Sequence, residues 1–180
     1  MNSSNFDPRR LIVLIGFSGS GKSYVAKRLA ECCGYEVLRS DAIRKELAGL
    51  KPTESAKAPF GGGIYTPQMT EKVYQTLMRR AKDIISKGGK AVLDATFLRK
   101  WQRELVYRYF PTAVFVWVNE PEEVVIERLK TRKGDISDAD ISVYRKQKEI
   151  FEPPTEGLLT FVIRSGEWKK LVSSLGLDRV

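Results

Sequence analysis

Residues 11–23, LIVLIGFSGSGKS, decide the fold of this chain. Residues 11–15 form an apolar run typical of a buried strand, and residues 16–23 fit the pattern G-x-x-x-x-G-K-[ST] in full. Glycines at these places let backbone N–H groups surround a phosphate closely, and the N-terminus of the helix that follows adds its positive dipole. The sequence therefore predicts a phosphate-binding loop between a strand and a helix.

Two side chains of this loop carry specific chemistry. Lys22 is placed to reach the β- and γ-phosphates of a nucleotide, and Ser23 offers a hydroxyl to Mg²⁺. A glycine-rich turn without function is the alternative, but an amphipathic helical stripe closed by Gly34 follows, as phosphate binding requires. We expect ATP and Mg²⁺ as cofactors, with the nucleotide held by Gly16, Ser18, Gly19, Ser20, Gly21, Lys22 and Ser23.

Four further apolar runs, at 35–38, 90–93, 113–118 and 158–163, read as strands buried on both faces of a parallel sheet. Helical periodicities lie between them, one opened by Thr66-Pro67 and ended by Gly88-Gly89. This alternation predicts an α/β fold, a three-layer P-loop NTPase of the small-kinase type with a five-stranded parallel sheet and a helical lid. We expect a single domain over 1–180, with a flexible tail at 1–9 and the lid at about 128–152.

The composition excludes several kinds of chemistry. The 180 residues include no histidine, so no Ser-His-Asp or Cys-His nucleophile can form and no imidazole can bind a metal. The 31 Lys and Arg against 22 Asp and Glu give a net charge of +9, which fits either a solvated basic surface or an acidic partner such as a nucleotide. Any catalysis must therefore use carboxylates, Lys, Arg, hydroxyls and backbone dipoles.

Location is indicated by what the sequence lacks. No apolar run approaches the ~18 residues that a membrane span needs, and no signal peptide is recognisable. The two cysteines, Cys32 and Cys33, are adjacent, which is poor geometry for a structural bridge and supplies too few ligands for zinc. We therefore expect a cytoplasmic protein without a membrane partner. The sequence does not indicate the oligomeric state.

Other classes that use the same loop can be set aside. Guanine switches need an Asn-Lys-x-Asp segment, and none of the chain's asparagines is followed by Lys. Transporter ATPases carry a Leu-Ser-Gly-Gly-Gln signature, which is absent, and ring-forming ATPase modules usually need a longer chain. A small kinase, in which one domain holds both nucleotide and acceptor, remains.

Such a kinase needs a carboxylate beside the acceptor hydroxyl and cations near the transferred phosphoryl group. Asp41 follows the second predicted strand, at the same edge of the sheet as the phosphate-binding loop. Arg44 lies one helical turn later and can hold an anionic group. Asp41 is thus a candidate base; the alternative is that it only caps the short helix 42–47.

Two further sites complete the predicted machinery. Asp94 directly follows the third apolar strand, where a carboxylate that holds Mg²⁺ belongs, although a strand-end turn would also accept it. Arg128 and Arg132 lie on one helical face and lead into a loop at Gly134. We expect them to act as lid arginines over the phosphates, while cations that favour a helix C-terminus are the alternative.

Together these segments resemble the zeta-toxin and polynucleotide-kinase-like group of P-loop kinases. The closest resemblance is to small bacterial AAA-family ATP-binding domains often fused to an aminoglycoside-phosphotransferase-like domain, a fusion partner that this chain lacks. The segments that carry the resemblance cover most of residues 10–152 and are GFSGSGKS (16–23), SDAIR (40–44), GIYTPQMT (63–70), VLDATFL (92–98) with Arg103, PEE (121–123) through Arg128 and Arg132, and SDAD (137–140).

The resemblance implies roles for individual residues. Asp41 would activate the acceptor hydroxyl, Arg44 would bind the acceptor, and Arg132 would contact the phosphates. Tyr65 and Arg103, which lie in the shared segments, are further candidates for substrate binding. The chain departs from the nucleic-acid kinases after Asp94, where Ala-Thr replaces the Thr-Asn that those enzymes tend to have.

The sequence thus favours an ATP-dependent kinase that moves the γ-phosphate to a hydroxyl of an unidentified acceptor, either a small molecule or a nucleic acid. In this reading Lys22, Asp41 and Arg132 are catalytic, and Ser23 and Asp94 hold the metal. One alternative is a regulatory ATPase module without an acceptor, and a second is a kinase of nucleic-acid 5′-hydroxyls.

Overall fold

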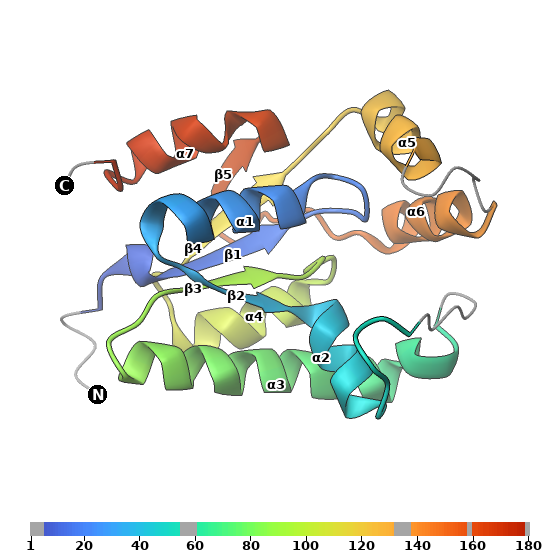
Figure 1. The fold of residues 1–180 in the computed structure, drawn as a ribbon, viewed down its shortest axis with the longest axis horizontal. Helices are drawn as coiled ribbons and strands as arrows, with labels where there is room; N and C mark the ends of the chain where they lie inside the picture. The colour runs from blue at the N-terminus through green and yellow to red at the C-terminus, as the bar shows by residue number, and fades with distance from the viewer. Residues whose placement is uncertain (1–5, 55–60, 132–137, 158–159, 179–180) are drawn as a thin grey trace.

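The structure is a computed structural model, which describes residues 6–54, 61–131, 138–157 and 160–178. Its centre is a five-stranded sheet with the order β2-β3-β1-β4-β5, in which every neighbouring pair is parallel (Figure 1). The strands are β1 (Leu11–Ile15), β2 (Glu36–Arg39), β3 (Ala91–Asp94), β4 (Val114–Val118) and β5 (Thr160–Ile163). The predicted five-stranded parallel sheet is confirmed.

Helices cover both faces of the sheet, which explains why the central strands are apolar throughout. Side chains alternate along β1, so that Val13 packs with the core beneath α3 (Pro67–Ser86) and α4 (Lys100–Tyr109). Leu14 packs on the other side with α1 (Lys22–Cys33) and α7 (Trp168–Ser174), as Figure 1 shows. The fold therefore has the three predicted layers.

Three helices lie beyond the carboxyl ends of the strands. They are α2 (Ser40–Leu47), α5 (Glu122–Thr131) and α6 (Asp138–Ile150), and they frame the edge of the sheet at which the phosphate-binding loop lies (Figure 1). Short 3₁₀ turns occur at η1 (Pro8–Arg10), η2 (Gly63–Tyr65) and η3 (Ser165–Glu167). The helices α5 and α6 occupy the region expected to form a helical lid, whose connecting residues 132–137 lie outside the described part.

Local sequence signals set most helix ends. The Thr66 hydroxyl accepts a hydrogen bond from the Met69 N–H at 3.3 Å and caps α3, with Pro67 in the first turn. Gly34 ends α1 in the left-handed conformation at φ 74°. Helix α2 begins at Ser40, so Asp41 lies inside its first turn and does not act as its cap.

Two expectations need correction. Residues 6–9, expected to belong to a flexible tail, contact the body of the protein: the Tyr35 hydroxyl donates to the Arg9 carbonyl, and the Phe6 ring packs 5.3 Å from that of Phe110. Cys32 and Cys33 form a disulfide in the last turn of α1, although their adjacency argued against a bridge.

Among the described residues, no helix is both long and apolar enough to span a membrane. The longest of the helices, α3, is amphipathic, with one face packed on the sheet and charged residues on the other.

Candidate active site

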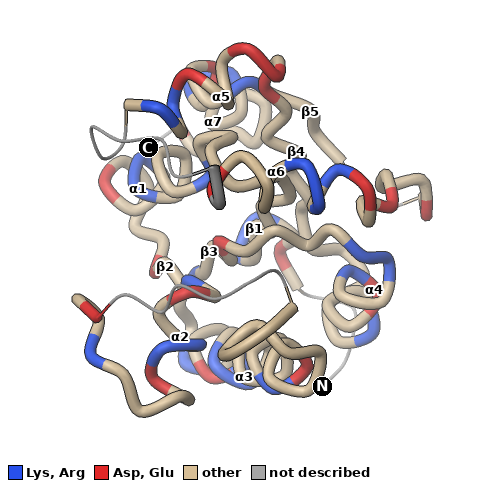
Figure 2. Tube along the Cα trace, turned by 90° about the vertical axis from the view of Figure 1, so that its right-hand side faces the viewer, with Lys and Arg blue, Asp and Glu red and all other residues tan. Residues whose placement is uncertain are grey.

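The phosphate-binding loop opens onto a cleft of about 910 Å³ at the carboxyl ends of the strands, the edge that faces the viewer in Figure 2. Ligands of open α/β sheets bind at this edge. The cleft brings together residues that are far apart in the sequence, from the loop, β2, α2, α3, β3, α4 and α6. Its lining includes the predicted site residues Ser18, Gly19, Gly21, Lys22, Ser23, Asp41, Arg44, Tyr65 and Asp94.

The loop needs glycine where other segments approach it. Gly21 has φ 94°, and a Cβ there would lie 2.5 Å from the Ser165 Cβ. At Gly16 a Cβ would lie 2.7 Å from the backbone oxygen of Val118. Lys22 begins α1, and its Nζ donates to the Phe17 carbonyl at 2.9 Å, so the ammonium group folds over the loop. The backbone thus has the shape of a phosphate cradle.

Ser23 and Asp94, predicted separately as metal ligands, lie together. The Ser23 hydroxyl donates to Asp94 Oδ2 at 2.8 Å, and Asp94 is only 7% exposed. The Arg39 Nε lies 3.7 Å from the same carboxylate oxygen. A hydroxyl and a carboxylate side by side at the mouth of a phosphate cradle are hard oxygen ligands of the kind Mg²⁺ prefers. These residues therefore fit the metal that the sequence implies.

Asp41 and Arg44 line the same cleft. Arg44 is 7% exposed, and its Nη1 donates to the Ile64 carbonyl at 2.9 Å and to the Thr70 hydroxyl at 3.1 Å. The Tyr65 ring covers the guanidinium, with its centroid 4.9 Å from Cζ. Burial lowers the pKa of Arg44, although the group stays protonated at neutral pH.

Arg44 has no carboxylate partner within the described residues, since its polar contacts end with the two oxygens and the ring. The nearby charge of Asp41 favours its protonated form without forming an ion pair. Buried cations are normally paired, because an isolated buried charge is costly. Arg44 is therefore a buried positive charge that an anion in the cleft would stabilise.

Arg128 lies on the other side of the phosphate-binding loop. Its Nη1 donates to the Gly19 carbonyl at 3.3 Å, and its Nη2 donates to the Ser165 hydroxyl at 2.9 Å. These residues border a second cavity of about 780 Å³, with Tyr24 and Arg164 on its rim. Arg128 thus touches the loop backbone, while Arg132, its predicted partner, lies outside the described residues.

The sequence reasoning missed Glu120, which organises this second cavity. Its carboxylate accepts hydrogen bonds from the Ser165 N–H at 2.9 Å, the Ser165 hydroxyl at 2.8 Å and the Arg164 Nε at 3.0 Å. Burial raises the pKa of Glu120, but the bonds from Ser165 and Arg164 and the charge of Arg128 outweigh it and hold the pKa below its usual value. The available signal was its position just after the carboxyl end of β4, which is comparable to that of Asp94 at the carboxyl end of β3.

Gln147 of α6 was also missed. The Ser18 N–H donates to Gln147 Oε1 at 2.9 Å, and Gln147 Nε2 donates to the Ser18 hydroxyl at 3.0 Å. This reciprocal pair joins the lid region to the phosphate-binding loop, and the Phe17 ring packs edge-on against Tyr144 of the same helix, 5.6 Å between centroids. No local sequence pattern marks Gln147, because its partner is distant in the chain.

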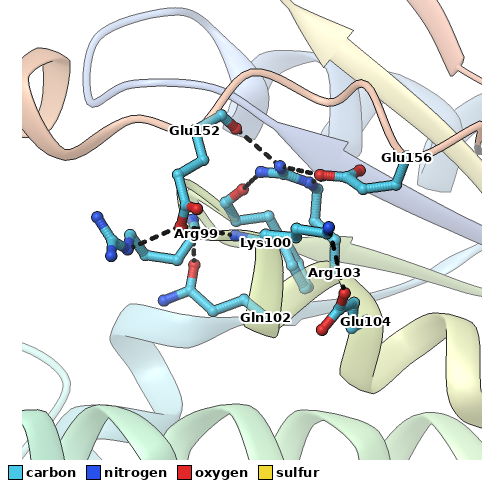
Figure 3. A network of polar contacts seen from close by, with 8 residues as sticks. Arg99, Lys100, Gln102, Arg103, Glu104, Glu152 and Glu156 are labelled. Carbon is cyan, nitrogen blue, oxygen red and sulfur yellow. Dashed lines mark hydrogen bonds and ion pairs between the residues drawn. The ribbon is translucent and has the colours of Figure 1, made fainter.

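Arg103 does not fit the substrate-binding role predicted for it. It is 0% exposed and does not line the cleft. Its guanidinium forms an ion pair with Glu156 at 2.5 Å and donates to the backbone carbonyls of Phe97 and Glu152 (Figure 3). Of the predicted substrate-binding residues, Arg44 and Tyr65 therefore face the cleft and Arg103 does not.

Two curated proteins are similar to this chain in sequence. An uncharacterized protein of Mycobacterium tuberculosis is 27% identical over 138 residues, covering 74% of this chain and 28% of that protein. A shikimate kinase of Persephonella marina is 29% identical over 144 residues, covering 79% of this chain and 80% of that enzyme. This chain therefore spans about a quarter of the length of the mycobacterial relative and most of the length of the shikimate kinase.

Solved structures support the fold independently. A sugar kinase from Janibacter superposes with a TM-score of 0.72 at 19% identity, covering 95% of this chain and 96% of that one. At this identity the likeness establishes the fold alone. The family model described as an AAA domain, AAA_33, matches residues 11–154. These residues include the phosphate-binding loop, Asp41, Asp94 and α6, and the chain thus belongs to this AAA domain family and has the fold of a P-loop kinase.

Proposed function

We propose that the protein is an ATP-dependent kinase, which transfers the γ-phosphoryl group to a hydroxyl of a small molecule. The observation that carries this proposal is that one cleft is lined both by the phosphate cradle and by Asp41 and Arg44. A kinase must bind the phosphoryl donor and the acceptor side by side. A nucleotide-binding switch needs the phosphate cradle but not the acceptor-binding residues Asp41 and Arg44.

The nucleotide would lie across the loop. The backbone amides of the loop and Lys22 bind its phosphates, and the second cavity, between Arg128 and the turn at Ser165, offers room for the base. Ser23 and Asp94 would hold Mg²⁺, which neutralises charge on the phosphates. Asp41 accepts the proton of the acceptor hydroxyl as the hydroxyl oxygen attacks the γ-phosphorus and ADP leaves. Arg132, which lies outside the described residues, would stabilise the charge of the transferred group.

The acceptor would carry an anionic group. Arg44 is 7% exposed and lacks a carboxylate partner within the described residues, so its guanidinium is best satisfied by a carboxylate or phosphate of the ligand. Tyr65 and Trp101, which are 37% and 41% exposed, offer ring faces in the same cleft for the carbon skeleton. The relatives' names point to small acceptors too, since one is a shikimate kinase and a structural neighbour is a sugar kinase.

Other expectations from the sequence remain predictions. The narrower likeness to zeta toxins and polynucleotide kinases rests on the sequence segments alone. A cytoplasmic location and a single domain over 1–180 are likewise proposals, as are the activity and partners of any longer protein of which this chain is part. Nucleic acid as acceptor and a purely regulatory ATPase are outcomes of the test below.

The test is transfer of label from [γ-³²P]ATP to a panel of hydroxyl acceptors. The panel contains neutral sugars, their carboxylated and phosphorylated counterparts, aminoglycosides, and 5′-hydroxyl RNA and DNA. We expect Mg²⁺-dependent labelling of an anionic hydroxylated compound, with its uncharged counterpart labelled more weakly. Labelling of oligonucleotides in preference would favour the nucleic-acid kinase, and ATP hydrolysis without any labelled acceptor would favour the regulatory module.

A substitution of Arg44 tests whether this residue binds an anionic group of the acceptor. Arg44→Met keeps an apolar stem under Tyr65 but removes the charge, so KM for an anionic acceptor should rise at least tenfold, while KM for ATP stays within about twofold. The control is Lys72→Met, an exposed cation of α3 that does not line the cleft. An equal effect on charged and uncharged acceptors would contradict the anionic acceptor without contradicting the kinase.

A further inference from the structure

A buried arginine outside the cleft joins two of the segments that build it. The Arg103 side chain is fully buried, and Figure 3 shows it between the start of α4 and the segment that follows α6. Its Nη1 donates to the Phe97 carbonyl at 2.8 Å, and its Nη2 donates to the Glu152 carbonyl at 2.7 Å. Glu156 neutralises it through Oε1 at 2.5 Å and Oε2 at 3.3 Å.

The Phe97 side of this contact leads to the metal ligand and the phosphate-binding loop. Phe97 has φ 47°, a conformation that is strained for a bulky residue and persists only where its surroundings enforce it. Two bonds do so: its N–H donates to the Tyr74 hydroxyl at 3.1 Å, and its carbonyl accepts from Arg103. The preceding residue, Thr96, accepts a bond from the Gly16 N–H at 3.1 Å, and Asp94 lies two residues before that.

The Glu152 side leads to α6. The Glu152 N–H donates to the Leu98 carbonyl at 2.9 Å, and Arg99 Nη1 donates to the Ile150 carbonyl at 3.0 Å at the end of the helix. One turn earlier, Gln147 holds Ser18 of the phosphate-binding loop. Arg103 therefore contacts both the turn after β3, which is bonded to Gly16, and the segment after α6, the helix that is bonded to Ser18.

We propose that Arg103 is a positioning residue, which fixes the turn after Asp94 and the end of α6 relative to each other and thereby sets the geometry of the phosphate-binding loop. This inference rests on the proposed kinase function for its catalytic consequence. A planar fork that reaches two carbonyls and a carboxylate at once is specific to arginine, so lysine does not replace it. The alternative is that the ion pair between Arg103 and Glu156 only stabilises the fold.

The experiment separates these two roles. Arg103→Met alone leaves the Glu156 charge poorly paired and could unfold the protein, so the main variant is Arg103→Met/Glu156→Leu, in which an apolar pair replaces the ions. Arg103→Lys is the second variant, which keeps the charge but not the fork. The control is Lys100→Ala/Glu104→Ala, an exposed ion pair on the same helix with its atoms 3.8 Å apart.

Three properties are measured on each full-length variant: the unfolding midpoint, amide hydrogen exchange, and Mg²⁺-dependent phosphoryl transfer. We expect exchange at Gly16, Phe97 and Ser18 to accelerate at least tenfold in both Arg103 variants, and not in the control. Where transfer is measured, we expect kcat to fall about tenfold or more and the Mg²⁺ concentration for half-maximal rate to rise.

The positioning role would be overturned if the folded Arg103 variants differed from the wild type only in unfolding midpoint. In that case their amide hydrogens at Gly16 and Ser18 would exchange at the wild-type rate. The exchange comparison needs no turnover. If the wild-type protein had no transferase activity, the proposed function would be contradicted. The exchange data would still decide whether Arg103 positions the loop.

Discussion

At the scale of single residues, Lys22 is the side chain on which phosphoryl transfer should depend most. Such transfers are dominated by positioning and by stabilisation of charge, and Lys22 is the cation of the phosphate cradle itself. We expect Lys22→Ala to lower kcat by roughly 100- to 1000-fold or more while the protein stays folded. A radiolabel assay and a circular dichroism melt measure the two effects, and retained transfer in the folded variant would contradict the assignment.

Asp41 separates a kinase from a regulatory ATPase. It lies in the first turn of α2 and lines the cleft together with Arg44. In a kinase, Asp41→Asn removes the base and should lower transfer by roughly 10²- to 10⁴-fold. Calorimetric titration should find ATP affinity unchanged. A variant that transfers phosphate at the wild-type rate would show that Asp41 neither deprotonates nor orients the acceptor.

Glu120 gives the stability of the protein a dependence on acid pH. Because the folded state holds its pKa below the usual value, ionised Glu120 contributes stability above the unfolded pKa of about 4.5, and this contribution is lost as pH falls through the folded pKa. In Glu120→Gln the decline in unfolding midpoint below about pH 4.5 should be shallower than in the wild type, and the midpoint at pH 7 should be lower. Parallel curves at all pH values would contradict this role.

At the scale of secondary structure elements, the sequence predicted what depends on neighbours in the chain. The apolar runs located all five strands to within about two residues of their ends, and Thr66-Pro67 and Gly34 marked helix ends because capping is local. The strand-end position predicted Asp94 and the glycine-rich motif predicted Ser23, and the two side chains meet because the parallel strands and the loop share one edge of the sheet.

Pairings between distant segments were not predictable in the same way. Gln147 meets Ser18 across 129 positions of the chain, and Arg103 meets Glu156 across 53, so neither pair leaves a periodic or local signal. Arg103 was predicted to bind substrate because the sequence pattern of a cation after a strand end is the same whether its side chain faces a cleft or the interior. The segment after α6 buries the Arg103 side chain, and the sequence alone did not predict that contact.

Helix α6 should influence the nucleotide through Gln147. Its two hydrogen bonds to Ser18 hold a residue of the phosphate-binding loop in place, and at about 1 kcal/mol each they correspond to a roughly 5- to 30-fold change in affinity. We therefore expect Gln147→Leu to raise KM for ATP within that range with little change in KM for the acceptor. Steady-state kinetics measure both. Tighter ATP binding would instead mean that Gln147 competes with phosphate for the Ser18 amide.

At the scale of the whole molecule, the positive charge of the described residues is not concentrated in the cleft. Among these residues, five basic and four acidic side chains line it, so most of their excess positive charge lies elsewhere on the surface, as the dispersed blue segments of Figure 2 indicate. The described lining of the cleft is therefore close to neutral overall, with Arg44 and Lys22 as buried cations. This distribution suits a small anionic acceptor better than a long polyanion, which needs an extended basic track.

The two cores on either side of one sheet predict that the whole chain unfolds as a unit. Strand β1 contributes Val13 to one core and Leu14 to the other, so neither can open without exposing the shared strand. We expect a single calorimetric transition whose enthalpy equals the van't Hoff enthalpy. Mg²⁺-ATP at 100 times its Kd should stabilise it by about 2.7 kcal/mol and move the entire transition upward, because the cleft draws on elements of both cores. Two transitions, of which ATP moves only one, would contradict the single domain proposed for residues 1–180.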